Sequence, residues 1–121
     1  MARTAVTVTA LSRTGAATAD GTSADPTNGH SVDLGGYPLE EFVFRFTNTN
    51  GTNRVATIKA GANPPATAAG QGDLAITVPA TTGDMTVAGL ESARFLQADG
   101  TVSIDLGASF AGAVRAFRVP R

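Results

Sequence analysis

Few residues in this 121-residue chain could carry chemistry, and the first candidate is a glycine-rich segment. Gly70-Gln71-Gly72-Asp73 has the glycine spacing of a loop that cradles a phosphate. A Walker-type loop continues into Gly-Lys and then Ser or Thr, and no lysine follows here. A dinucleotide fingerprint runs from strand into helix, whereas this segment leads into the apolar run Leu74–Val78. Asp73 would also repel a phosphate, so the sequence predicts a connection into a strand.

The single histidine is the second candidate. His30 could act as a general base, with Ser31 or Asp33 close to it in sequence. On a strand, however, residues 30 and 31 point to opposite faces and cannot pair directly. The chain has no cysteine and one tyrosine, so few other groups titrate near neutral pH. We therefore expect a protein that is not an enzyme.

Metal-binding and glycosylation motifs are equally weak. Asp20, Asp25 and Asp33 offer oxygen ligands, but they are too few and lack the spacing of a calcium loop. Asn50-Gly51-Thr52 matches a glycosylation acceptor, yet a tight turn already explains the Asn-Gly pair. We expect no metal and no cofactor.

Charge and hydropathy restrict the partners. The net charge is −1, and although Arg115, Arg118 and Arg121 cluster in sequence, the first two are three residues apart and would face opposite sides of a strand, so we expect no nucleic acid. No apolar run approaches the roughly 20 residues of a membrane span. The opening residues 1–6 lack the apolar region of a signal peptide. We therefore expect no membrane partner, and a cytoplasm-like compartment or an assembly formed there.

The composition and turn pattern predict an all-β fold. Thr and Val suit strands, and fourteen glycines and six prolines separate short segments. We expect residues 1–121 to form one antiparallel β-sandwich, jelly-roll-like or immunoglobulin-like, of about eight strands. The expected strands lie at 4–11, 30–34, 39–47, 54–60, 73–79, 85–88, 91–98, 101–106 and 112–119.

Two hairpins are expected within this pattern. Residues 39–47 place Phe42, Phe44 and Phe46 on one face, which we take as the centre of the core. The following Asn-Gly turn predicts a hairpin over residues 39–60. Residues 91–98 have helical residue types, but Asp99-Gly100 and the alternation after it favour a second hairpin.

Three segments are candidates for contact with a partner. Residues 1–11 are an arm or an edge strand. Residues 12–29 form an unusually long loop that is functional, is ordered against a partner, or conceals a short strand at 16–19. Asn63-Pro64-Pro65 stiffens residues 60–72 into a surface loop that either touches a partner or spans the sandwich.

Six segments resemble a group of small virion proteins encoded near the capsid genes of tailed bacteriophages, especially those of high-GC actinobacterial hosts. The matching segments are Thr7–Leu11, Asp25–His30, Lys59–Pro65, Gly70–Leu74, Glu91–Ile104 and Phe117–Pro120. The resemblance implies a capsid decoration (cement) or minor capsid protein with a β-sandwich fold. Such a protein, assembled in the host cytoplasm, binds the exterior of the major capsid protein lattice as a homo-oligomer, for example a trimer.

This resemblance directs the choice of contact residues and of alternatives. The expected capsid or subunit contacts are Arg3, Thr4, Val6, Val8, Asn63, Pro64, Pro65 and Arg118. The alternatives are a tail, neck or head-fibre module and, more distantly, a carbohydrate-binding β-sandwich. The absence of tryptophan disfavours the carbohydrate reading, because sugar sites usually need aromatic platforms.

Overall fold

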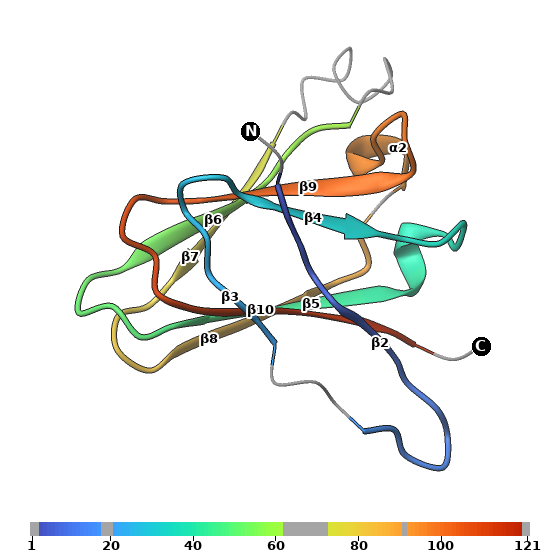
Figure 1. Ribbon diagram of the computed structural model, residues 1–121, viewed down its shortest axis with the longest axis horizontal. Helices are drawn as coiled ribbons and strands as arrows, with labels where there is room; N and C mark the ends of the chain where they lie inside the picture. Colours follow the sequence, from blue (N-terminus) through green and yellow to red (C-terminus); the bar gives the residue numbers. More distant parts are fainter. Residues whose placement is uncertain (1–2, 18–20, 62–72, 91, 120–121) are drawn as a thin grey trace.

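The computed structural model describes residues 3–17, 21–61, 73–90 and 92–119, which form two mixed, open β-sheets (Figure 1). The first sheet has the strand order β1 (Thr4–Ala5), β4 (His30–Asp33), β9 (Thr101–Leu106), β6 (Arg54–Ile58) and β7 (Leu74–Val78). The second has the order β2 (Val8–Ala10), β10 (Gly112–Arg118), β5 (Phe42–Asn48) and β8 (Gly83–Ala88), with β3 (Thr22–Ser23) also paired to β10. Two short helical turns, η1 (Leu39–Glu41) and α2 (Ser92–Phe95), complete the described elements.

The buried side chains of the two sheets form one hydrophobic core. Burial alternates along β5 and β9, as it must when one face of a strand is covered and the other is not. The predicted stripe of Phe42, Phe44 and Phe46 is confirmed, since none of the three is more than 1% exposed. Sequence alternation therefore located the centre of the core correctly.

The expectation of a purely antiparallel arrangement is wrong. Strand β1 pairs parallel with β4, and β2 pairs parallel with β10. The single strand expected over residues 4–11 is therefore two short strands, one in each sheet, with Val6 buried between them. Figure 1 shows this blue segment descending from beside β4 to beside β10. Alternation specifies which face a residue takes, but not which neighbour the strand selects.

The hairpin expected over residues 39–60 is also wrong, because β5 lies in the second sheet and β6 in the first. Asn48 accounts for the crossing, since its side chain is fully buried at the end of β5. Its Nδ2 donates to the carbonyls of Thr52, Val78 and Pro79, each at 3.1 Å. Its Oδ1 accepts from the amide of Asn50 at 2.9 Å. These bonds tie the bend at Asn50-Gly51 to the end of β7. The chain therefore does not fold back beside β5 as a two-stranded hairpin.

The second expected hairpin is replaced by helix α2, which leads into β9. Phe95 is buried, and the Oγ of Ser92 donates to Glu40 Oε1 at 2.7 Å and accepts from the Leu39 amide at 3.0 Å. This segment thus adopts the helix that its residue types favour, and the strand alternation begins only at Thr101. Asp99-Gly100 does form a turn, closed by the Gln97 amide donating to the Thr101 carbonyl at 2.8 Å.

The long loop contains one short strand, but not at the expected place. The strand is β3, whereas residues 16 and 17 lie in no strand and residues 18–20 fall outside the described part of the chain. In the described ranges, no helix has the length and apolar character needed to cross a bilayer.

Replacing the crossing residue tests this account of the fold. Asn48→Ala should lower the free energy of unfolding by about 2–4 kcal/mol, because it leaves buried carbonyls without donors. Urea denaturation measures the change. Asn53→Ala, which removes an exposed acceptor of the Ala80 amide, should cost less than about 1 kcal/mol. Equal losses in both variants would contradict the role given to Asn48.

Candidate functional site

A buried histidine lies where the N-terminal segment passes from the first sheet to the second. The His30 side chain is fully buried, and both of its ring nitrogens are hydrogen bonded. Nδ1 lies 3.1 Å from the carbonyl oxygen of Thr4 in β1. Nε2 accepts from the backbone amide of Asp25 at 3.0 Å. One imidazole therefore joins β1, β4 and the loop that precedes β4.

These two partners determine the protonation state of the ring. A carbonyl can only accept and an amide N–H can only donate, so Nδ1 carries the proton and Nε2 does not. Burial lowers the pKa of His30, while the Thr4 carbonyl and the Asp25 carboxylate oppose that effect and Arg3 adds to it. His30 is thus a neutral structural bridge, and neither nitrogen is available to take a proton from a substrate.

The side chain of Asp25 also bonds to β1. Its Oδ2 accepts from the Thr4 hydroxyl at 2.6 Å, and its Oδ1 accepts from the Asn28 amide at 3.1 Å. The Thr4 and Asn28 hydrogen bonds lower the pKa of Asp25, so the carboxylate stays ionised. We call His30, Asp25 and Thr4 the N-terminal clasp.

Arg3 extends the clasp onto the outer surface of the first sheet. Its Nη1 donates to Asp105 Oδ1 at 2.6 Å and to the Ile104 carbonyl at 3.0 Å. Gly29, at φ +74°, makes this possible, since a Cβ there would lie 2.5 Å from Arg3 Nη1 and 2.9 Å from Asp105 Oδ1. A side chain at position 29 would therefore displace Arg3.

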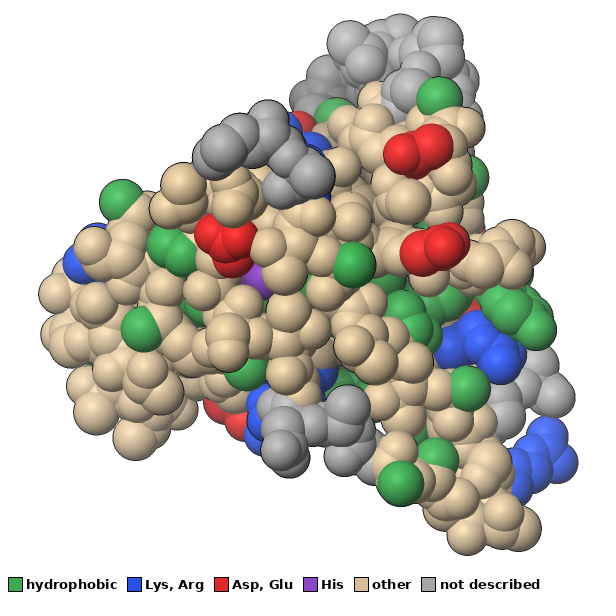
Figure 2. All heavy atoms as spheres, in the orientation of Figure 1, with side chains coloured by type: hydrophobic (Ala, Val, Ile, Leu, Met, Phe, Trp, Pro, Cys, Tyr) green, Lys and Arg blue, Asp and Glu red, His purple; other side chains and the backbone are tan. Residues whose placement is uncertain are grey.

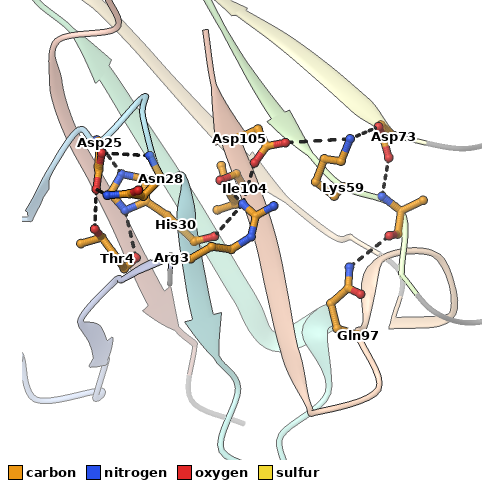
Figure 3. A network of polar contacts seen from close by, with 11 residues as sticks. Arg3, Thr4, Asp25, Asn28, His30, Lys59, Asp73, Gln97, Ile104 and Asp105 are labelled. Atoms are coloured by element: carbon orange, nitrogen blue, oxygen red, sulfur yellow. Dashed lines mark hydrogen bonds and ion pairs between the residues drawn. The ribbon is translucent and has the colours of Figure 1, made fainter. Parts of the chain in front are cut away.

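Polar contacts continue across the sheet from Asp105 (Figure 3). Lys59 Nζ lies 2.8 Å from Asp73 Oδ2 and 3.9 Å from Asp105 Oδ2. Asp73 Oδ1 accepts from the Ala60 amide at 2.6 Å, and the Ala60 carbonyl accepts from Gln97 Nε2 at 3.0 Å. The Asp73 contact raises the pKa of Lys59, and the Ala60 amide, followed by Lys59, lowers the pKa of Asp73. These pairs are exposed, so they orient side chains more than they stabilise the fold.

A shallow groove lies beside this network. Its volume is about 500 Å³, and its lining is Arg3, Ser31, Gln97, Ala98, Asp99, Thr101 and Ser103. Ser31 and Ser103 are direct cross-strand partners, so short hydroxyl side chains form part of the lining between β4 and β9. The lining contains no aromatic ring, so the groove has no platform on which a sugar could stack.

The outer face of the first sheet is formed mainly by small, uncharged side chains. Within its strands the outward positions are Ala5, Ser31, Asp33, Val55, Thr57, Ala75, Thr77, Thr101, Ser103 and Asp105. Only two of these ten strand positions carry a charge, and Arg3, Lys59 and Asp73, which flank the strands, add the three charges of the ion-pair network around Asp105. Figure 2 shows the molecule from the side that carries the N-terminal segment, and the charged side chains visible there are scattered and form no single patch.

Unlike the first sheet, the second sheet has arginine side chains at outward positions within its strands. Arg45 and Arg115 are direct cross-strand partners, and Arg45 forms a two-point ion pair with Asp84 at 2.9 and 2.5 Å. At the end of β10, the Arg118 guanidinium lies 3.9 Å from the ring centroid of Tyr37. Tyr37 also lines a smaller, more apolar pocket of about 270 Å³. One face of the only tyrosine ring is thus already occupied by Arg118.

The structure brings some of the expected contact residues together. Thr4 belongs to the clasp and Arg3 adjoins it, whereas Val6 is only 5% exposed and Val8 packs against the core. Arg118 lies in β10, the strand that β2 joins. Asn63, Pro64 and Pro65, together with the segment Gly70-Gln71-Gly72, lie outside the described residues. Val6 therefore offers little surface to a partner, and contact by the others stays a prediction.

Sequence reasoning missed the clasp. The Asp-Pro-Thr-Asn-Gly run at 25–29 is a turn signature that could have indicated the bond from the Asn28 amide to Asp25. No sequence signal links His30 to Thr4, because that contact depends on a parallel pairing between distant segments.

No cluster of three or more metal-binding side chains occurs within the described ranges. Comparisons of the chain with protein-family models, curated proteins and solved structures found no match.

The clasp predicts acid-sensitive folding. Because the pKa of His30 is lowered on folding, the unfolded chain binds more protons near pH 6.5, and stability must fall as pH decreases through that value. Urea denaturation between pH 8 and pH 5 measures this slope. His30→Gln keeps a donor and an acceptor without a titrating ring, and should flatten the slope. The pKa of Asp25 is also lowered, so its own contribution is lost only at more acidic pH. An identical slope in both proteins would contradict the assignment.

Proposed function

We propose that the chain is a non-enzymatic structural protein of a bacteriophage virion that decorates and stabilises the assembled capsid. In this proposal the two sheets form a jelly-roll-like or immunoglobulin-like β-sandwich whose partner is the major capsid protein lattice. The segments that resemble small virion proteins of tailed phages suggest this class of partner. The structural support comes from the outer face of the first sheet.

One observation carries the proposal: eight of the ten outward strand positions on that face are uncharged and mostly small. Burying a charge against another protein is costly unless it is paired, and interface cores are depleted of charged residues. Short Ser, Thr and Ala side chains also lose little conformational freedom on contact. This face can therefore be covered by another protein at a lower desolvation cost than a Lys- and Glu-rich surface.

The proposed mechanism is mass action. A protein that binds the assembled lattice but not its separate subunits stabilises the lattice by RT ln(1 + [L]/Kd). No bond is made or broken, which agrees with the structural use of both nitrogens of His30. A homo-oligomer on a symmetry axis would present several copies of the same face and gain affinity through multivalency.

Surface substitutions test the binding face better than a truncation of residues 1–11. Such a truncation would remove Val6 from the core and two strands from the sheets, so it would damage the fold as well as any contact. Outward residues on either sheet can instead be replaced without disturbing the core.

Ala75→Arg and Ser103→Arg place a charge on the outer face of the first sheet, and Ala88→Arg places one on the second. The first two should weaken binding to undecorated capsids by at least about tenfold, because the new guanidinium must be desolvated. Co-sedimentation with capsids of the phage that encodes this chain measures binding. Ala88→Arg should bind like the unmodified protein.

Two results would overturn the proposal. Equal binding by all three variants would exclude the first sheet as the contact face. Cryo-EM of the intact particle with density for this chain only at the tail or neck, or nowhere in the particle, would exclude capsid decoration itself.

A further inference from the structure

The N-terminal segment Thr4–Ala10 is attached to the rest of the fold at two sheet edges. Within the described residues, β1 pairs only with β4 and β2 only with β10, in both cases in parallel. Its backbone amides add bonds from Thr4 to the Gly29 carbonyl at 3.0 Å and from Val6 to the Ser31 carbonyl at 2.9 Å. The residues that follow, 12–17, are exposed throughout. The segment could thus move without breaking any other strand pairing.

The site that receives this segment, which we call its seat, is specific for its sequence. It holds one buried side chain, Val6, and it offers separate polar partners to Arg3 and Thr4. Gly29 leaves the space through which Arg3 reaches Asp105. Because the seat matches Thr4, Val6 and the preceding Arg3 in this order, the same segment of a second copy of the chain would reproduce all of these contacts.

His30 couples this seat to pH. A second proton would have to sit on Nε2, where it would face the Asp25 amide, and two donors cannot bond to each other. The charged groups that act on the ring are Asp25, which attracts an imidazolium, and Arg3, which repels it. Burial outweighs the attraction of Asp25, so a charged ring requires water. Thr4 bonds to Nδ1 from β1, so water gains access when the segment departs.

We propose that Thr4–Ala10 is an exchangeable segment that leaves its seat when His30 is protonated and takes the same seat on a second copy of the chain. Because both seats are identical, the exchanged pair recovers every contact of the single molecule when the pH returns to neutral. This inference concerns self-association and does not rest on the proposed virion function.

A disulfide trap can detect the exchange, because the chain has no cysteine of its own. Ala5 and Ser31 are direct partners in the β1–β4 pairing, so Ala5→Cys with Ser31→Cys places two thiols within the range of a disulfide. The reduced protein is held at pH 5, returned to pH 8, oxidised, and separated on a non-reducing gel. We expect covalent dimers at least fivefold more abundant than in a sample kept at pH 8. Only monomers after the acid step, or equal dimer amounts with and without it, would overturn the proposal.

Two controls isolate the segment and the histidine. Thr57→Cys with Ala75→Cys joins β6 to β7, which lie away from the moving segment, and should give monomers under both conditions. Adding His30→Gln to the Ala5 and Ser31 double variant should abolish the effect of the acid step. Acid-dependent dimers in that triple variant would overturn the role of His30.

Amide hydrogen exchange on the unmodified protein gives a second readout if the cysteine variants fail to fold. After correction for the intrinsic pH dependence, protection of the Thr4 and Val6 amides should fall at least tenfold between pH 7 and pH 5. Protection of the β6 and β9 amides should fall less than that of Thr4 and Val6, because these strands lose protection only through the change in global stability. Unchanged protection at Thr4 and Val6 would overturn release of the segment.

Discussion

The fold depends on how the chain crosses between its two sheets. A strand that leaves one ladder for another exposes backbone groups to an apolar interior, where an unpaired amide or carbonyl is costly. His30 and Asn48 are the two fully buried polar side chains among the described residues, and each lies at such a crossing. At the end of β5, the Asn48 side chain donates to three backbone carbonyls. At the start of β4, the His30 ring bonds to the Thr4 carbonyl and to the Asp25 amide. Because such bonds are directional, the two residues fix which strands enter which sheet.

These crossings also connect the interior to the outer surface. Arg3 adjoins the clasp and lines the groove on the first sheet, and its guanidinium bonds the backbone of β9 and Asp105. A partner that covers this groove would therefore contact the segment held by His30. The remaining outward residues of that sheet are mostly small and hydroxylated, so Arg3 and the neighbouring ion pairs are its main fixed charges. The position of the N-terminal segment thus determines part of the face that we propose as the capsid contact.

The sequence predicted local features better than long-range pairings. The Phe42, Phe44 and Phe46 stripe, the positions of β9 and β10, and the all-β composition followed from alternation and turn residues. The chain bends at Asn50-Gly51 and turns at Asp99-Gly100, where the sequence placed its turns, but the elements that these segments join were not predicted correctly. A turn signature specifies backbone torsions, whereas the partner of a strand depends on contacts such as those of Asn48. The clasp was missed for the same reason, since 26 residues separate Thr4 from His30 and the contact requires a parallel pairing.

The central claim is that a neutral His30, protonated on Nδ1, holds the N-terminal segment in place. His30 is the only histidine in the chain, so its ring nitrogens can be assigned without ambiguity by ¹H–¹⁵N correlation spectroscopy of the imidazole. At pH 7.5 the account predicts a protonated Nδ1 and an unprotonated Nε2, in keeping with the Thr4 carbonyl and the Asp25 amide as their partners. A proton on Nε2, or an imidazolium at that pH, would contradict it.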